Sequence, residues 1–518
     1  MTQPTPITSS AVDLDAGPEL SLDHAACYRA VASRDPRFDG KIFTGVKTTG
    51  IYCRPICPAR TPHSGNVLFY PSAAAAQEAG FRPCLRCRPE TAPDLGAWRG
   101  TSNTVSRALS LIELGALDEG DVDGLASRVG VGERQLRRLF QRHLGASPVA
   151  AAQTRRVLLA KQLIHETRLP MAEIALASGF GSIRRFNETF QQLFRRPPSA
   201  LRRADAPEIS AGPSGEIALL LRYRAPYDWP AMLAFLRLRA IRGVETVDGE
   251  VYSRTIALDG AVGTLSVEPA AGVDALKAVI RFPKLSALPA IIARLRRVFD
   301  LAADPVAIGA QLAEDPALAP LIAARPGLRV PGAWDGFELA IRAILGQQVT
   351  VTAGIALAGK LVAGHGESLA PDAARSGLTH VFPTPERLAA SDLTSLGMPG
   401  ARARALSAMG AAVAADPAIL AGRGGLEDAI ARLRALPGIG EWTAQYIALR
   451  ALREPDAFPA ADIGLLRALE DETGKRPTPA ELLARSERWR PWRAYAAQHL
   501  WASYAPHAEV KPAKARAA

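Results

Sequence analysis

The feature that most constrains this chain is its cysteine arrangement. The sequence has five cysteines, all before residue 88. Cys53 and Cys57 form one close pair, and Cys84 and Cys87 form a second. Two close pairs joined by a longer loop are typical of a tetrahedral thiolate site, because each pair holds one edge of the ion. Thiolates select zinc among the common metal ions. The sequence therefore predicts one zinc ion, with Cys27 as an ordinary helix cysteine.

The spacing leaves several alternatives open. Unrelated buried cysteines and an iron–sulfur cluster are less favoured interpretations. A zinc-bound thiolate can be a purely structural ligand, or a nucleophile that attacks an alkyl group while it stays coordinated. Spacing alone does not separate these two roles. An odd cysteine count also argues against a disulfide framework. The N-terminus lacks a secretory signal, and no apolar run reaches the ~18 residues of a membrane span. A cytoplasmic protein without a membrane partner is expected.

Length and composition indicate several globular domains. The chain has 518 residues, which suggests about three to four domains. Its net charge of +11 favours a polyanionic partner. Alternating apolar and polar residues with turns at Asp248-Gly249 and Asp259-Gly260 predict strands and hairpins. The pattern is almost wholly helical from about 285 to 505. We expect a disordered tail over 1–20, a zinc domain over 21–95, a helical domain over 100–203, an α+β domain over 215–325, a helical domain over 326–505 and a tail over 506–518.

Residues 120–200 contain two similar helix-turn-helix units. In the first, Gly130 makes the turn, and Leu136, Leu139 and Phe140 are expected to be buried. This leaves polar side chains facing outward, as in a helix that reads DNA bases. One such unit could be an ordinary helical hairpin, but two in tandem favour DNA binding. The outward-facing residues are Arg134, Gln135, Arg137 and Arg138 in the first unit, and Arg184, Arg185 and Asn187 in the second.

The segment LRALPGIGEWTAQYIALRA has the form helix, hairpin, helix. Gly438 and Gly440 let the backbone approach a phosphate closely, and N–H groups at the start of the second helix can hold it. An ordinary helix turn is the alternative. Asp462 follows in DAFPAADIGLLRAL. This residue is either a simple N-cap of the helix that begins at Ile463 or an acidic functional group.

The cysteine segments KTTGIYCRPICPARTP and NVLFYPSAAAAQEAGFRPCLRCRPE closely resemble the zinc domain of the Ada family of alkylation-response proteins. The resemblance implies that Cys53 accepts a methyl group from a DNA phosphotriester, and that the other three cysteines hold the zinc. The tandem helix-turn-helix resembles an AraC-family DNA-binding domain, which follows the zinc domain in Ada. The Ada module for O-alkylated guanine is absent, since no cysteine follows Cys87. Several arginines surround the cysteines, as phosphate contact requires: Arg54, Arg60, Arg82, Arg86 and Arg88.

Residues from about 216 to 505 resemble AlkA-type DNA-3-methyladenine glycosylases, for example in RVPGAWDGFELAIRAILGQQVTV and ERWRPWRAYAAQHLWASY. The resemblance implies a small α+β domain followed by an all-helical helix-hairpin-helix domain. It places Asp462 at the catalytic aspartate, with Ala461 where the family has a second acidic residue. Gln348 falls at the residue that fills the gap in the DNA stack, where the best-known member has an apolar wedge. Aromatic positions lining the base pocket fall on Trp442, Tyr446 and Trp492.

The implied chemistry suits these residues. Alkylation of a ring nitrogen gives the base a positive charge, so it stacks well on electron-rich aromatic rings and leaves easily. A carboxylate can stabilise the oxocarbenium-like sugar or activate water. Bifunctional members of this superfamily form a Schiff base with a hairpin lysine, but Trp442 occupies that position here. The sequence therefore predicts a monofunctional glycosylase.

The leading prediction is a multidomain α+β protein that fuses an Ada-type methyl sensor and transcription activator with an AlkA-type glycosylase. Its expected partners are double-stranded DNA, both alkylated and promoter DNA, and RNA polymerase. One rival is a DNA-binding regulator whose C-terminal half is a non-catalytic damage sensor, which would not need a carboxylate opposite an aromatic pocket. A third interpretation is a zinc-stabilised DNA-binding module without thiol chemistry. Methylation of Cys53 would distinguish it.

Overall fold

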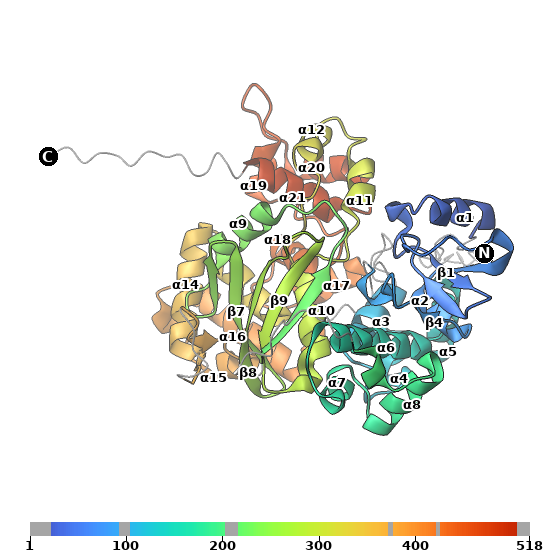
Figure 1. The fold of residues 1–518 in the computed structure, drawn as a ribbon. Coiled ribbons are helices and arrows are strands. Elements are labelled where there is room, and N and C mark those ends of the chain that lie inside the picture. Colours follow the sequence, from blue (N-terminus) through green and yellow to red (C-terminus); the bar gives the residue numbers. More distant parts are fainter. Residues whose placement is uncertain (1–21, 93–103, 203–215, 371–376, 421–424, 505–518) are drawn as a thin grey trace, which may run out of the picture.

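The computed structural model describes residues 22–92, 104–202, 216–370, 377–420 and 425–504. The fold is multidomain α+β, as predicted. Figure 1 shows the N-terminal elements, coloured blue to green, on one side and the elements from the yellow-green sheet to the red C-terminal helices on the other. The predicted tails, and the two segments between the predicted domains at 96–99 and 204–214, lie outside the described residues. None of the helices in the described ranges is long and apolar enough to cross a membrane.

Residues 22–92 form the cysteine region, a four-stranded sheet with two helices. The strand order is β3-β1-β2-β4, with β2 antiparallel to β1 and parallel to β4. Gly45 in β1 is needed because a Cβ there would lie 2.8 Å from the Tyr70 ring and 3.0 Å from the Phe81 ring. The elements are α1 (His24–Ala32), β1 (Phe43–Val46), β2 (Ile51–Cys53), β3 (Val67–Tyr70), α2 (Ala73–Glu78) and β4 (Arg82–Pro83).

Residues 104–202 form the helix-turn-helix region, and both predicted units are present. Gly130 and Gly179 adopt left-handed conformations at the turns, with φ of 81° and 86°. Asp121 and Ser182 cap the first helix of unit one and the second helix of unit two through their side chains. Leu136, Leu139 and Phe140 are buried as predicted. The helices are α3 (Thr104–Glu113), α4 (Val122–Val129), α5 (Glu133–Leu144), α6 (Pro148–Glu166), α7 (Met171–Ala177) and α8 (Ile183–Phe194).

An antiparallel five-stranded sheet follows, with the order β5-β9-β8-β7-β6. Its hairpins turn at the predicted positions, where Gly249, Asp259 and Gly260 all have positive φ. The elements are β5 (Glu216–Arg222), α9 (Trp229–Arg239), β6 (Glu245–Asp248), β7 (Val251–Leu258), β8 (Ala261–Pro269), β9 (Ala275–Arg281) and α10 (Leu288–Val298).

The C-terminal part is helical and surrounds one hydrophobic cluster. The helical pattern of the sequence did not predict the short pair β10 (Glu367–Ser368) and β11 (His380–Val381). The helices are α11 (Pro305–Leu312), α12 (Ala319–Ala324), α13 (Gly336–Leu345), α14 (Val351–His365), α15 (Pro385–Ala390), α16 (Gly400–Ala415), α17 (Leu426–Arg434), α18 (Glu441–Ile447), a π-helical turn (Ala448–Leu452), α19 (Ile463–Ala468), α20 (Pro479–Ser486) and α21 (Arg493–Tyr504).

The second helix-turn-helix unit and the five-stranded sheet share one hydrophobic cluster. Phe190 and Leu201 belong to the same cluster of buried residues as Leu219 of β5 and Ile291 of α10. Helix α6 lies against β5, and Figure 1 shows α7 beside the lower end of α10. The two halves of the chain therefore meet through apolar packing as well as through the covalent link.

A buried ion pair joins the cysteine region to α6. The Lys161 ammonium donates to Glu90 at 2.6 Å and to the carbonyl oxygen of Cys84 at 2.9 Å. Neither side chain is exposed by more than 1%. Burial alone would raise the pKa of Glu90, but the charge of Lys161 and hydrogen bonds from His165 and Lys161 outweigh burial and lower that pKa to about 2.

The network continues from this pair to the sheet. Arg88 donates to Glu166 at 2.8 Å, and Glu166 accepts the backbone N–H of Leu220 in β5 at 3.2 Å. A second polar joint lies nearby, where Arg224 donates to the carbonyl oxygens of Pro36 and Arg37 at 3.2 and 3.3 Å. The cysteine region is thus hydrogen-bonded to both of its neighbours.

We predict that Lys161→Met lowers the free energy of unfolding by about 3–5 kcal/mol, because it removes the closer of the two cations paired with the buried Glu90 carboxylate and leaves only Arg88. The double variant Lys161→Met/Glu90→Gln should recover most of that loss, since no uncompensated charge remains. Urea unfolding followed by circular dichroism measures both. Equal losses in the single and double variants would contradict this account.

Candidate functional sites: a thiolate cluster and a carboxylate among aromatic rings

The four paired cysteines meet at one end of the small sheet. Cys53 ends β2 and Cys84 directly follows β4, and these strands run parallel with Tyr52 opposite Pro83. The two strands therefore deliver the two cysteine pairs to the same edge. The four Sγ atoms lie within 4.8 Å of one another.

The cluster fits one zinc ion. Four thiolates around zinc form a tetrahedron with S···S edges of about 3.8 Å, given Zn–S bonds of about 2.3 Å. Backbone N–H groups of Arg54 and Arg86 donate to Cys87 Sγ and Cys84 Sγ, each at 3.3 Å, as suits thiolate acceptors. Cys53 and Cys57 are half-buried, whereas the other pair is buried, so only the first pair is open to a reactant.

The prediction that Arg54 contacts phosphate is wrong. Its guanidinium is buried, pairs with Asp39, and donates to Thr91 Oγ1 at 2.6 Å. Arg88 is likewise engaged with Glu90 and Glu166. A buried and fully bonded guanidinium cannot reach a phosphate without dismantling its partners. Arg60 and Arg86 are exposed, and Arg82 is half-buried, so these three keep an open side toward solvent.

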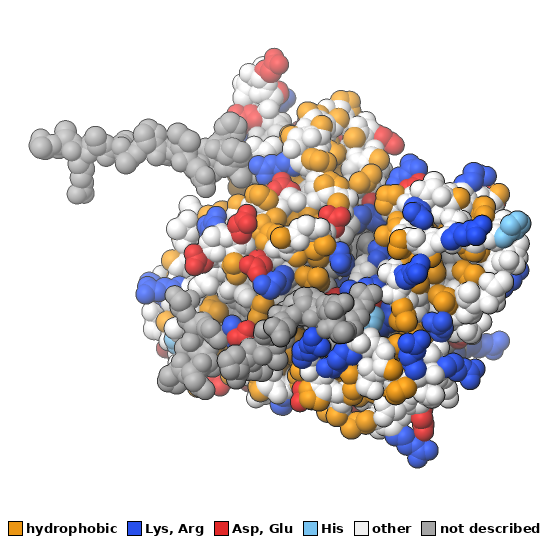
Figure 2. Space-filling model, in the orientation of Figure 1, with side chains coloured by type: hydrophobic (Ala, Val, Ile, Leu, Met, Phe, Trp, Pro, Cys, Tyr) orange, Lys and Arg blue, Asp and Glu red, His pale blue; other side chains and the backbone are white. Residues whose placement is uncertain are grey.

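The predicted base-reading residues lie on α5 and α8. All are exposed except Gln135, which is half-buried: Arg134, Arg137 and Arg138 on α5, and Arg184, Arg185 and Asn187 on α8. Arg137 pairs with Glu133, and Arg184 pairs with Glu188, both four residues away on the same helix. Such exposed pairs are weak and separate easily when a phosphate or a base competes. Figure 2 shows Lys and Arg side chains gathered over the N-terminal half of the molecule.

Asp462 combines both roles that the sequence left open. It caps α19, where Oδ1 accepts the backbone N–H groups of Gly464 at 2.8 Å and Leu465 at 3.2 Å. It also lies among aromatic rings, because Oδ1 accepts the indole N–H of Trp501 and Oδ2 that of Trp442, each at 2.8 Å. The cap fixes the carboxylate, and the indoles orient it.

Three aromatic rings gather beside Asp462. Trp442 and Tyr446, one turn apart on α18, stack with centroids 5.3 Å apart and an interplanar angle of 11°. Trp501 of α21 meets Tyr446 edge-on at 6.4 Å. Sequence reasoning did not single out Trp501, because its place beside Asp462 depends on the packing of α21 against α19. The only available signal was that it lies in the resembling segment at residues 487–504.

The contacts described for Trp492 are with residues outside this group of rings. Its indole N–H donates to Gln311 at 3.1 Å, and its ring meets Tyr495 edge-on at 5.9 Å. A pocket role for Trp492 stays a prediction.

A buried arginine lies behind the rings. Arg450, in the π-helical turn after α18, places its guanidinium 5.6 Å from the Tyr446 centroid and 5.1 Å from that of Trp501. Burial alone would raise the pKa of the Tyr446 phenol, but the charges of Arg450 and Arg239 outweigh burial, and the pKa lies below its ordinary value. The rings are therefore held against a fixed positive charge.

The hairpin and the gap-filling position lie close together. Gly438 has φ of 79°, and a Cβ there would lie 2.5 Å from that of Ala405, so only glycine fits. Gly440 is the N-cap of α18 and has open space around it. Gln348 is exposed and has φ of 55°, in the loop between α13 and α14. Gln347, its neighbour, donates to the carbonyl oxygen of Gly438.

Comparison with known proteins identifies the parts of this assembly. Three family models match: the metal-binding domain of Ada over residues 26–90, a helix-turn-helix domain over 125–204, and the AlkA N-terminal domain over 218–335. A probable bifunctional transcriptional activator/DNA repair enzyme AlkA of Mycobacterium tuberculosis is 42% identical over 482 residues, which cover 92% of this chain and 96% of that protein. The chain belongs to this AlkA family of bifunctional proteins.

Two further relatives match separate parts of this chain. The DNA-3-methyladenine glycosylase 2 of Escherichia coli is 37% identical over 286 residues, covering 54% of this chain and 95% of that protein. The bifunctional activator and repair enzyme Ada of Escherichia coli is 40% identical over 125 residues, covering 24% of this chain and 33% of that protein. The predicted fusion is confirmed: this chain joins a zinc-binding, DNA-binding regulator of the adaptive response to a DNA glycosylase for alkylation repair.

We predict that acid destabilises the helix that carries Trp501. Burial of His499 on α21 lowers its pKa from 6.5 to about 4. Between these values the unfolded chain binds a proton that the folded chain does not, so stability falls as pH falls from 6.5 toward 4. At pH 5 the wild type should lose about 2 kcal/mol relative to pH 7.5 from this residue.

The variant His499→Gln keeps a donor for Leu321 and lacks the titration. Urea unfolding at the two pH values measures the difference, and all other groups titrate alike in both proteins. An identical pH dependence for wild type and variant would contradict the assignment to His499.

Proposed function

We propose that the glycosylase half hydrolyses the N-glycosidic bond of N-alkylated bases such as 3-methyladenine, with Asp462 as the catalytic carboxylate. The observation that carries this proposal is the position of Asp462 between the indole N–H groups of Trp442 and Trp501. Both of its oxygens accept N–H hydrogen bonds, which is the arrangement for an ionised carboxylate. A non-catalytic sensor would not need this group beside stacked rings.

The residues suit the charges that develop in the reaction. When the bond between C1′ and the base nitrogen breaks, its electron pair neutralises the cationic base, and positive charge appears on the sugar. The Asp462 carboxylate stabilises that charge and accepts the proton of the attacking water. Trp442 and Tyr446 offer π surfaces for an alkylated base. No lysine lies beside Asp462 in the contacts described for it, which supports a monofunctional reaction.

DNA is held by elements on either side of this group. We propose that the hairpin at Gly438 and Gly440 binds the DNA backbone. Gln348 then fills the space that the flipped base leaves in the stack. The exposed residues of α5 and α8 read promoter DNA. We also propose that the domains begin and end at the residues predicted from the sequence.

We further propose that Cys53 takes a methyl group from a DNA phosphotriester. Its Sγ attacks the methyl carbon, the C–O bond breaks, and the oxygen leaves as a phosphodiester, so no proton moves. Zinc, when bound by the four cysteines, keeps the sulfur a thiolate at neutral pH. The methylated protein then binds its promoter more tightly and recruits RNA polymerase. Support comes from the half-buried position of Cys53, which it shares with Cys57, in a cluster whose other two cysteines are buried.

Replacing Asp462 with Asn should lower the rate of 3-methyladenine release by about 10²-fold or more, the usual effect of removing a positioned acid–base group. DNA binding should persist, and borohydride should trap no covalent adduct with the wild type. Release is scored by chromatography of bases from methylated duplex DNA. Asp471→Asn, on an exposed turn nearby, is the matched control. Full activity in Asp462→Asn, or a trapped adduct, would sink the assignment and favour the sensor interpretation.

Methylation of Cys53 should raise promoter affinity through charge. Four thiolates with Zn²⁺ carry −4 + 2 = −2, and one thioether leaves −1, so repulsion from DNA phosphates falls. A coupling of about 1–3 kcal/mol is expected. Promoter binding by methylated and unmethylated protein is titrated against salt, and the affinity gap should shrink as salt rises. Cys53→Ser is the control, and peptide mass mapping separates Cys53 from Cys57. A gap that stays constant with salt would favour a conformational switch.

A further inference from the structure

The loop that carries the gap-filling position is hydrogen-bonded to the hairpin and to α18 through one side chain, that of Gln347. This loop, residues 346–350, joins α13 to α14, and Gln348, Val349 and Thr350 are exposed. Gln347 is half-buried and points the other way. Its amide Nε2 donates to the Gly438 carbonyl oxygen at 2.9 Å and to Thr443 Oγ1 at 3.0 Å.

Both hydrogen-bond acceptors of the Gln347 amide lie in well-packed parts of the structure. Gly438 sits in the hairpin with a left-handed backbone packed against Ala405. Thr443 is 3% exposed on α18, one residue after Trp442. The two hydrogens of the Gln347 amide therefore connect the loop to the hairpin and to the helix that carries the aromatic rings. A side chain without donors would leave the Gly438 carbonyl and the buried Thr443 hydroxyl without this partner.

The backbone beside Gln347 is held as well. Arg402 of α16 donates to the Gln347 carbonyl oxygen at 2.5 Å. The next residue, Gln348, has φ of 55°, a left-handed conformation that a non-glycine residue adopts only when its surroundings impose it. The contacts of Gln347 lie directly before this residue and supply that constraint.

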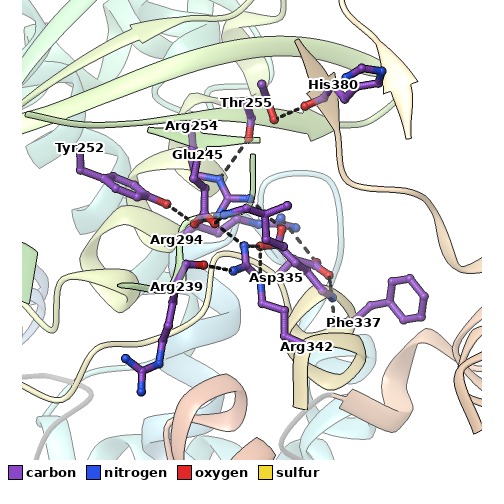
Figure 3. A network of polar contacts seen from close by, with 12 residues as sticks. Arg239, Glu245, Tyr252, Arg254, Thr255, Arg294, Asp335, Phe337, Arg342 and His380 are labelled. Atoms are coloured by element: carbon purple, nitrogen blue, oxygen red, sulfur yellow. Dashed lines mark hydrogen bonds and ion pairs between the residues drawn. The ribbon is translucent and has the colours of Figure 1, made fainter. Parts of the chain in front are cut away.

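Helix α13, which leads into the loop, is fixed to the five-stranded sheet by a polar network (Figure 3). Arg342 pairs with Glu245 of β6 and Glu338, and donates to the carbonyl oxygen of Arg239 at 2.8 Å. Arg254 of β7 pairs with Glu338 at 2.7 Å. These ion pairs fix the helix that leads into the loop. The hydrogen bonds of Gln347 then connect the loop to the hairpin.

We propose that Gln347 is a positioning residue for the glycosylase reaction: it locks the loop so that Gln348 enters the DNA stack when the hairpin grips the backbone. Gln347 itself touches neither the base nor the sugar. This inference rests on the proposed function, which assigns the hairpin to the backbone and Gln348 to the gap.

The test uses the full chain with two substitutions, alone and together. Gln347→Met keeps the length of the side chain and removes its donors, and Gln348→Ala removes the gap-filling group. Single-turnover release of 3-methyladenine at saturating protein should fall about tenfold in each, the effect of losing one or two hydrogen bonds. Affinity for undamaged DNA should change less than twofold. Because Gln347 acts through Gln348, the double variant should be no slower than the slower single variant.

A second readout does not need catalysis. A duplex with a tetrahydrofuran abasic analogue beside 2-aminopurine reports stacking at the gap by fluorescence. Wild type should change this signal, and all three variants should reduce the change to a similar extent. Gln153→Met, in α6 and remote from the hairpin, is the matched control for glutamine replacement.

The outcomes separate the two proposals. Additive losses in the double variant, or wild-type rates and fluorescence in Gln347→Met, would overturn the positioning role while leaving the glycosylase assignment intact. A lower thermal midpoint with an unchanged fluorescence response would assign Gln347 a purely structural role and also overturn the inference. Loss of base release in Asp462→Asn supports the proposed function, and a matched reduction of base release and fluorescence change in the three glutamine variants supports the positioning role. Absence of base release by wild type would overturn the proposed function and the inference with it.

Discussion

One ion pair that has no contact with water holds the cysteine region against the helix-turn-helix region. Lys161 extends from α6 to Glu90, which lies three residues after Cys87. The same ammonium holds the carbonyl oxygen of Cys84. Two buried charges of opposite sign offset each other only when both are present and fully hydrogen-bonded. The backbone of the metal-binding loop is therefore placed by a residue of the DNA-binding region, and a change on either side of this contact affects the other.

A similar dependence governs the glycosylase half. Asp462 is oriented by the first turn of α19, by an indole from α18 and by an indole from α21. No single helix supplies this geometry. Arg450 lies behind the rings and donates to the Pro331 carbonyl oxygen and to Gln498, each at 3.0 Å. The carboxylate thus owes its position to packing among distant segments, and local sequence supplies only the capping part.

Sequence patterns predicted the features that depend on short-range spacing. The cysteine pairs, the glycine turns of the helix-turn-helix units and the hairpins of the sheet follow from residues close together in the chain. Features that depend on tertiary contacts were missed or mistaken. Trp501 reaches Asp462 only because α21 packs on α19. The sequence suggested that Arg54 contacts phosphate, because it could not show that Arg54 pairs with Asp39, fifteen residues earlier. The pocket role of Trp492, chosen by resemblance, stays a prediction, since its ring contacts Tyr495 and its indole N–H donates to Gln311.

The hydrophobic cluster shared by α8 and the five-stranded sheet has a consequence for how the protein uses DNA. Phe190 of α8 and Leu219 of β5 belong to one hydrophobic cluster, so the second helix-turn-helix unit and the five-stranded sheet pack together. Under the proposed function, a chain bound to promoter DNA therefore holds its glycosylase half at a fixed distance and orientation from that site. Lesions in the adjoining DNA then encounter an enzyme whose effective concentration is fixed by geometry and not by copy number. Under the proposed function, lesions in regulatory sequences would be the first that the glycosylase half meets.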